Sequence, residues 1–379
     1  MDDAIEFHRK HKGKFAIASK VPLKNKEDLS LAYTPGVAKV SMAVSKDNSL
    51  AYSLTSKGNM VAVVSDGTAV LGLGDIGPYG AMPVMEGKAI LFKHFGNIDA
   101  VPICLNTKDV DKIVETVKMI APTFGGINLE DISAPRCFEV EERLKRELDI
   151  PVFHDDQHGT AIVVVAAIIN ALKIVKKDIN DVTVVISGAG AAGIATAKLL
   201  GVAGVEKLFL VDSKGITSRS RTDLNKYKKE LSDKFNMEKQ GSLKDALKDA
   251  DIFIGVSVAG ALKQDMIKGM ARDPIIIAMA NPVPEIMPDE AYAAGAAIVA
   301  TGRSDFPNQV NNLLAFPGIF RGAFDCGAKQ ITEEMKIASA HALAALIKHP
   351  TKDKILPTPF DEGVVEAVST AVKLVHKIF

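Results

Sequence analysis

The sequence predicts a two-domain α/β protein: an N-terminal α/β domain, then a Rossmann-like doubly wound parallel sheet with C-terminal helices. From Asp181 onward, short β-branched runs alternate with helical segments, which is the pattern of a parallel sheet with crossover helices. A glycine-rich loop at residues 188–193 directly follows the first of these runs. The length of 379 residues allows two domains of ordinary size.

Bulk composition indicates a soluble globular protein. Lysines plus arginines (46) balance aspartates plus glutamates (46), so nothing in the net charge favours nucleic acid or an anionic membrane as a partner. The three scattered cysteines do not form the pattern of a disulfide framework and fit a reducing compartment. The longest apolar run, residues 160–172, is too short for a bilayer, and the N-terminus lacks a signal-peptide pattern. We therefore expect a cytoplasmic protein.

The first half of the chain is expected to mix helices with short buried strands. Helices are predicted at residues 2–10, 26–31, 85–94, 110–121 and 138–148. Strands are predicted at residues 100–104, 127–129 and 151–154. The runs 61–65 and 69–73 are β-like and are separated by Asp66-Gly67, a pattern typical of a hairpin. A glycine-rich loop, residues 72–77, follows them.

The second half begins with a nearly all-apolar helix at residues 161–176, which we expect to be buried between layers. Strands are predicted at residues 182–187, 207–211, 252–256, 275–279 and 297–300. The tail is expected to be helical at 332–349 and 362–379 and to fold back on the first half. We place the domain boundary in the helix that begins near Gly159, which gives domains 1–158 and 159–379.

The glycine-rich loop after the strand at 182–187 is predicted to bind a dinucleotide. Its residues are Gly188, Ala189, Gly190, Ala191, Ala192 and Gly193. The first glycine permits a tight turn, the second lets the backbone approach a pyrophosphate, and the third allows close helix–strand packing. The following helix presents free N–H groups and a partial positive charge to the phosphates.

Asp212 ends the next predicted strand, at the position from which a carboxylate hydrogen-bonds the ribose 2′-hydroxyl. This position favours NAD, because a carboxylate repels the 2′-phosphate of NADP. Lys214 and Arg219 follow closely and could restore NADP binding. The choice between the two nucleotides therefore stays open, with NAD preferred.

Two acidic pairs indicate a divalent cation site. Glu130-Asp131 and Asp155-Asp156 each follow a short predicted strand, where parallel sheets present their active sites. Three carboxylates from these pairs would form a hard oxygen site suited to Mg²⁺ or Mn²⁺. His154 and His158 are candidates either for additional ligands or for packing residues around the site, and we favour packing.

Eight segments together resemble the malic enzyme family in its short microbial form. They are Tyr33-Thr-Pro-Gly-Val-Ala38, Ser65-Asp-Gly67 with Leu71-Gly-Leu-Gly-Asp-Ile-Gly77, Glu86-Gly-Lys88, Asn128-Leu-Glu-Asp131, His154-Asp-Asp-Gln-His-Gly-Thr160, the 188–193 loop, Asn281-Pro282 and Asn311-Asn312. They occur in family order across most of the chain. Agreement with a single motif arises easily by chance, but agreement with eight in order does not.

The resemblance implies oxidative decarboxylation of L-malate to pyruvate and CO₂, reduction of NAD(P)⁺, a need for Mg²⁺ or Mn²⁺, and a homodimer. Oxaloacetate decarboxylation is an implied side activity. The active site would lie in the cleft between the domains. The implied roles are Tyr33 as general acid, Lys88 as general base, Glu130, Asp131 and Asp156 as metal ligands, Asp155 as support, and Asn281 and Asn312 as contacts to substrate or nicotinamide. Which of Asn311 and Asn312 faces the site stays open, as does whether Tyr33 acts in its own or a neighbouring subunit.

Two consequences of the resemblance concern single positions. An unperturbed lysine has a pKa near ~10.4, so Lys88 acts as a base only if burial or the cation depresses its pKa. Large-subunit members carry an arginine that grips a malate carboxylate, and the aligned position here is Ala69. The second carboxylate anchor must therefore come from elsewhere: a backbone N–H, another basic side chain or a second subunit.

Three other functions compete with this interpretation of the sequence. A metal-dependent oxaloacetate decarboxylase without nucleotide use is disfavoured by the intact glycine loop and Asp212. A nucleotide sensor would need neither Tyr33 nor Lys88. An amino-acid dehydrogenase of similar plan would need no cation site.

Overall fold

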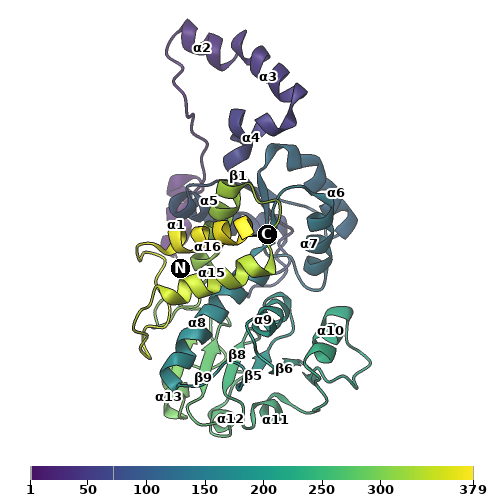
Figure 1. Cartoon of the computed structure of the whole chain (residues 1–379), viewed down its shortest axis with the longest axis vertical. Coiled ribbons are helices and arrows are strands. Elements are labelled where there is room, and N and C mark those ends of the chain that lie inside the picture. The colour runs from purple at the N-terminus through teal and green to yellow at the C-terminus, as the bar shows by residue number, and fades with distance from the viewer. Residues whose placement is uncertain (1, 71, 379) are drawn as a thin grey trace.

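The computed structural model describes residues 2–70 and 72–378, and it confirms the predicted α/β class with two largely parallel sheets. Leu71, which belongs to the predicted 69–73 run and to the glycine-rich motif, lies outside the described residues, as does Phe379 at the end of the predicted tail helix. The strands of the second sheet occupy the lower part of the molecule in Figure 1, and the last helices of the chain, α15 and α16, cross its middle.

The first sheet has four parallel strands in the order β2-β1-β3-β4. Their bounds are β1 Met60–Ser65, β2 Asp99–Cys104, β3 Gly126–Leu129 and β4 Val152–His154. The predicted hairpin is wrong, because both edges of β1 are taken by parallel neighbours, β2 and β3. Of the described residues in the 69–73 run, none joins this sheet, and Val70 instead forms an isolated bridge with Gly74.

Helices connect and cover these strands. They are α1 Asp2–His11, α2 Lys26–Ala32, α3 Gly36–Lys46, α4 Ala51–Leu54, α5 Gly77–Gly96, α6 Val110–Ile120 and α7 Arg136–Glu147. Short 3₁₀ turns lie at Asn48–Leu50, Ser56–Asn59, Ala121–Thr123 and Asn312–Leu314. In α6, the helical spacing of Ile113, Val114 and Val117 places them on one buried face, and the Asp109 side chain caps the first turn.

The second sheet has the order β10-β9-β8-β5-β6-β7, and only the β6–β7 pair is antiparallel. Its strands are β5 Thr183–Ser187, β6 Lys207–Asp212, β7 Gly215–Ile216, β8 Ile252–Gly255, β9 Ile275–Ala278 and β10 Ile298–Thr301. Every strand predicted for this sheet is confirmed, and the two-residue β7 was missed because it is too short to show a pattern. The chain leaves β5 in one direction toward β6 and returns on the other side as β8, which places the topological switch point beside β5.

Helices pack on this sheet and join it to the first. They are α8 Thr160–Val175, α9 Ala191–Val202, α10 Lys226–Lys234, α11 Leu243–Leu247, α12 Gln264–Ile267, α13 Pro288–Ala293, α14 Phe316–Cys326, α15 Glu333–Ala345 and α16 Val364–Ile378. The segment Asp155–Val175 is long and apolar enough to cross a membrane, but 67% of its apolar window is buried within the protein, as in a core helix. It packs against α9 and α15.

The chain returns to the first half through α14, which precedes the predicted tail, whereas α15 and α16 of that tail pack on α8, on α14 and on each other. Helix α14 packs against α5, and the rings of Phe92 and Phe316 lie 4.6 Å apart between their centroids. Phe320 also meets Phe92, edge to face at 5.4 Å. Residues after the second sheet therefore complete the core around the first sheet. The boundary between 1–158 and 159–379 stays a prediction.

Helices α2, α3 and α4 form an arm that stands apart from both sheets, with α2 and α3 at the top of Figure 1. None of the described residues in these three helices is buried. The arm nevertheless exposes apolar side chains, namely Leu29, Leu31, Tyr33, Val37, Val40, Met42 and Leu54. An exposed apolar surface of this kind typically marks a contact with another protein surface.

Replacing Phe92 with alanine should destabilise the protein strongly, because its fully buried ring joins α5 to α14. The expected loss in the free energy of unfolding is about 3–5 kcal/mol, measured by urea-induced unfolding. Phe360→Ala, which truncates an exposed phenylalanine, is the control and should cost less than about 1 kcal/mol. Equal costs for the two variants would contradict the packing role of Phe92.

Candidate active site

A cavity of about 650 Å³ lies between the two sheets and receives residues from both. The first half contributes Ala69, Gly72, Asp131, Ile132, Ser133, Ala134 and Asp156 to its lining. The second half contributes Thr160, Gly190, Ala191, Ala192, Val256, Ser257, Met279, Ala280, Asn281, Gly302, Val310, Asn311 and Asn312. Two of the predicted acidic residues, Asp131 and Asp156, therefore share one cavity with the middle of the predicted glycine loop, residues 190–192.

Glu130, Asp131 and Asp156 converge at its wall, each offering an oxygen within 4.8 Å of the others. The two acidic pairs follow β3 and β4, which are parallel neighbours, so their carboxyl ends meet at one edge of the sheet. Asp131 adopts a left-handed backbone conformation with φ 55°, which turns the chain so that consecutive carboxylates face the same point. The Asp131 N–H also donates to Asp156 Oδ2 at 2.8 Å.

The donor set fits a hard divalent cation. All three groups are carboxylates, and Oδ2 of Asp131 is buried without a hydrogen-bond partner among the described residues. Burial, reinforced by the charges of Asp156 and Glu130, raises the pKa of Asp131 to about 9. Burial raises the pKa of Glu130 to about 7. Neighbouring buried carboxyl groups disfavour one another's ionisation because their charges repel. A bound cation would offset this repulsion and allow all of them to be ionised.

The two histidines do not join this cluster among the described residues. His158 Nε2 hydrogen-bonds both carboxylate oxygens of Glu141 at 2.9 Å, which supports the packing interpretation. His154 is fully buried, with Nδ1 3.8 Å from Asp156 Oδ2. Burial lowers the pKa of each histidine to about 4, so both rings are neutral near pH 7.

Lys88 projects from α5 toward the acidic cluster and is only 7% exposed. Its Nζ lies 2.6 Å from Asp155 Oδ2 and 2.9 Å from Glu130 Oε1. Nζ also sits 4.2 Å from the centre of the Phe316 ring. Burial by itself lowers the pKa of Lys88, but the charges of Asp155 and Glu130 outweigh burial and raise the pKa above its usual range. Of the two causes considered for a depressed pKa, burial is therefore outweighed by these carboxylates, and the cation remains as the other.

Tyr33 lies away from the cavity of its own chain. It ends α2 on the exposed arm, with 67% of its surface accessible, and it is not among the described residues that line the cavity. The structure brings Lys88, Asp155 and the three carboxylates together and leaves Tyr33 outside this group.

The glycine loop has the geometry expected of a phosphate-binding turn. Gly188 has a positive φ of 116°, and a Cβ on Gly193 would lie 1.8 Å from the Gly188 carbonyl oxygen. A Cβ at Gly190 would meet nothing within 4 Å, so the backbone there opens into the cavity. Asn281, Asn311 and Asn312 line the same cavity, but Asn311 Oδ1 already accepts the Leu313 N–H at 2.9 Å.

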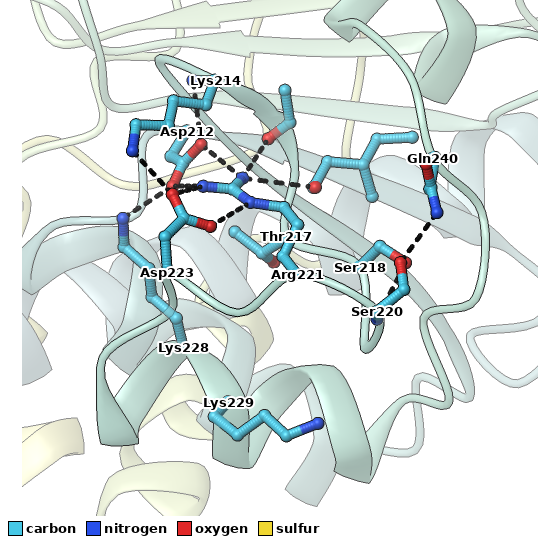
Figure 2. Close-up of polar contacts among 12 residues, drawn as sticks. Asp212, Lys214, Thr217, Ser218, Ser220, Arg221, Asp223, Lys228, Lys229 and Gln240 are labelled. Carbon is cyan, nitrogen blue, oxygen red and sulfur yellow. Dashed lines mark hydrogen bonds and ion pairs between the residues drawn. The ribbon is translucent and has the colours of Figure 1, made fainter.

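Asp212 ends β6 inside a cluster of cations that Figure 2 shows converging on its carboxylate. Arg221 binds it with two N–H groups at 2.8 and 3.1 Å, and Lys228 binds it at 2.7 Å. Asp223 pairs with Arg221 and with Lys214. Burial by itself raises the pKa of Asp212, but Arg221 and Lys228 outweigh burial and lower the pKa to about 2.

Sequence reasoning missed both principal partners of Asp212. It named Lys214 and Arg219, but Arg219 bonds Asn236 and lies 3.4 Å from Asp233 instead. Arg221 lies in an irregular loop and Lys228 lies in α10, so no periodic sequence pattern relates either residue to Asp212. Their charge and closeness to the end of β6 in the sequence were the only available indication.

Among the described residues that line the cavity, none is a lysine or an arginine. Arg136, another residue that sequence reasoning missed, supports the loop beside Ala69. It bonds Asp66 at 2.8 Å, Thr68 at 3.0 Å and Ser133 at 3.1 Å. The missing arginine is therefore not replaced by a basic side chain from the described cavity wall.

Comparison with known proteins agrees with this arrangement. Residues 12–145 match the family described as malic enzyme, N-terminal domain, and residues 157–377 match malic enzyme, NAD binding domain. The chain is 59% identical over 375 residues to the bifunctional malic/malolactic enzyme of Bacillus subtilis, covering 98% of this chain and 92% of that protein. It is 58% identical to the NAD-dependent malic enzyme of Geobacillus stearothermophilus over 365 residues, covering 95% of this chain and 76% of that protein.

Solved structures agree as well. The NAD-dependent malic enzyme of Thermotoga maritima superposes with a TM-score of 0.94 at 53% identity, covering 98% of this chain and 99% of that one. The malic enzyme of Pyrococcus horikoshii superposes with a TM-score of 0.96 at 48% identity, covering 100% of this chain and 90% of that one. With both halves matched in order and the whole chain superposed, the protein belongs to the malic enzyme family.

Proposed function

We propose that this chain is an NAD(P)-dependent malic enzyme that oxidises and decarboxylates L-malate to pyruvate and CO₂ with the help of Mg²⁺ or Mn²⁺. The observation that carries the proposal is the meeting of the acidic cluster and the nucleotide loop at one cavity. A decarboxylase acting on oxaloacetate without a nucleotide is not favoured, because it would not need the loop that lines this cavity. Oxaloacetate decarboxylation remains a proposed side activity.

Glu130, Asp131 and Asp156 would hold the divalent cation. When bound, this ion polarises the reacting oxygen of the substrate as a Lewis acid. Asn281 and Asn312, which line the same cavity, would contact substrate or nicotinamide. We assign Asn312 rather than Asn311 to this contact, because the Asn311 side-chain oxygen already caps its own turn.

Lys88 takes the proton of the malate hydroxyl at Nζ while the C2 hydride leaves for the nicotinamide. The lysine must be neutral for this step, and in the cation-free geometry Glu130 and Asp155 favour its charged form. A cation held by Glu130 opposes that charge, so loading the site would push the pKa of Lys88 downward. Asp155 stays paired with Lys88 and positions its amine.

Tyr33 acts, in this proposal, in the active site of a second copy of the chain, where it protonates C3 of the enolate left by decarboxylation. Two observations support an intermolecular role: its exposure, and an arm whose described helical residues are all unburied despite their apolar side chains. The proposal therefore includes a homodimer. The free thiols of Cys104, Cys137 and Cys326 support a reducing location, and we propose the cytoplasm.

Replacing Lys88 with alanine should lower kcat for malate oxidation by about 10²–10⁴-fold, because no group would accept the hydroxyl proton. The assay contains L-malate, Mn²⁺ and NAD⁺ and follows reduced nucleotide and CO₂ together. Lys93→Ala, an exposed lysine on the same helix, is the control and should retain activity. Release of CO₂ from oxaloacetate by the wild type without any malate-dependent nucleotide reduction would overturn the proposed function.

Mixing two inactive variants should restore activity if Tyr33 acts between subunits. Tyr33→Phe and Lys88→Ala proteins are unfolded together, refolded and assayed, with each variant refolded alone as the control. Random pairing makes about half of the dimers mixed, and each mixed dimer has one intact site, so about a quarter of wild-type activity should return. Activity no higher than that of the separate variants would place Tyr33 in its own chain's site.

Replacing Asp212 with alanine should shift the nucleotide preference toward NADP by about 10-fold or more in kcat/KM. The change removes a negative charge and releases Arg221 and Lys228 to meet a 2′-phosphate. Asp233→Ala, which removes an exposed carboxylate paired with Lys229, serves as the matched control. An unchanged ratio of kcat/KM for the two nucleotides would remove Asp212 from the ribose subsite.

A further inference from the structure

A buried polar chain lies next to the metal-ligand turn and is not used in the mechanism above. It joins Lys336 of α15, which is 1% exposed, through His158 to Glu141 of α7, which is 4% exposed. Lys336 Nζ lies 3.1 Å from His158 Nδ1, and His158 Nε2 lies 2.9 Å from both oxygens of Glu141. Among the described residues, those lining the main cavity include neither Lys336 nor Glu141.

Lys336 determines the direction of the hydrogen bonds between Lys336, His158 and Glu141. An ammonium group has no lone pair, so His158 Nδ1 must accept its hydrogen. The other ring nitrogen, Nε2, then carries the ring hydrogen and donates it to Glu141. The lysine thus fixes the tautomer in which His158 can bind Glu141.

Glu141 binds the chain on both sides of the acidic pair, at His154 and at His158. Besides binding His158, its Oε1 accepts the backbone N–H of His154 at 3.3 Å and lies 2.7 Å from Lys145 Nζ. His154 directly precedes the π-helical turn Asp155–Gly159 and His158 lies within it, so Asp155 and Asp156 fall between the two attachment points. A π-helical turn inside longer helical structure is uncommon and is often found at functional sites. One carboxylate therefore bridges the segment that includes Asp155 and Asp156.

We propose that Glu141 and Lys336, acting through His158, are positioning residues that hold this turn in the conformation that binds the divalent cation. The inference rests on the proposed cation site. It assigns to α15 a role in metal binding, although no residue of α15 belongs to the acidic cluster of the described chain. Partners that orient metal ligands in this way commonly affect metal affinity about 10–100-fold.

The test measures equilibrium Mn²⁺ binding to the full chain by electron paramagnetic resonance, without substrate or turnover. Glu141→Gln replaces a carboxylate with two acceptor oxygens by an amide with one, although several donors converge there. Lys336→Met removes the hydrogen-bond donor to His158 and keeps a long apolar side chain that can fill the same space. Each should raise the Kd for Mn²⁺ by about 10-fold while NAD⁺ binding stays unchanged. Glu147→Gln, on the surface of the same helix α7, is the matched control and should bind Mn²⁺ like the wild type.

Thermal unfolding and NAD⁺ binding verify that each variant is folded, and Lys336→Met decides the question if Glu141→Gln does not fold. Unchanged Mn²⁺ affinity in the folded variants would overturn the inference. Asp156→Asn separates this result from failure of the proposed site, because it should abolish binding. If the wild type bound Mn²⁺ no better than Asp156→Asn, the cation site and this inference would both fall.

Discussion

The structure depends on the crowding of acidic side chains at the carboxyl ends of β3 and β4. Four acidic side chains from two sequence pairs meet there, and Lys88 contacts only two of them, Glu130 and Asp155. Burying like charges in a low-dielectric interior is costly unless further positive charge is supplied. In the proposed function, a divalent cation supplies that positive charge.

Several elements distant in sequence support this arrangement. Parallel pairing of β3 with β4 aligns the acidic pairs, α5 brings Lys88, and α14 places Phe316 beneath the lysine. The C-terminal helices come after the nucleotide-binding sheet yet pack around the first sheet. The C-terminal helices therefore join the two halves, and one hydrophobic core includes residues of both, while a smaller cluster lies within the second half alone.

Much of this could be predicted from the sequence, because the signals were local. A strand followed by the glycine loop predicted β5 and α9, and acidic pairs directly after short apolar runs predicted the grouping of Glu130, Asp131 and Asp156. The hairpin after β1 was wrong because local turn preferences say nothing about parallel neighbours that come from residues far along the chain. The partners of Asp212 and the placement of Tyr33 depend on tertiary structure, so no pattern in the nearby sequence could identify them.

The exposed arm bears on how specific activity depends on protein concentration. None of the described residues of α2 and α3 is buried within its own chain, so a single copy has little to hold these helices in a defined orientation. If a neighbouring molecule supplies that surface, specific activity becomes subject to mass action and declines on dilution, even where each chain stays folded.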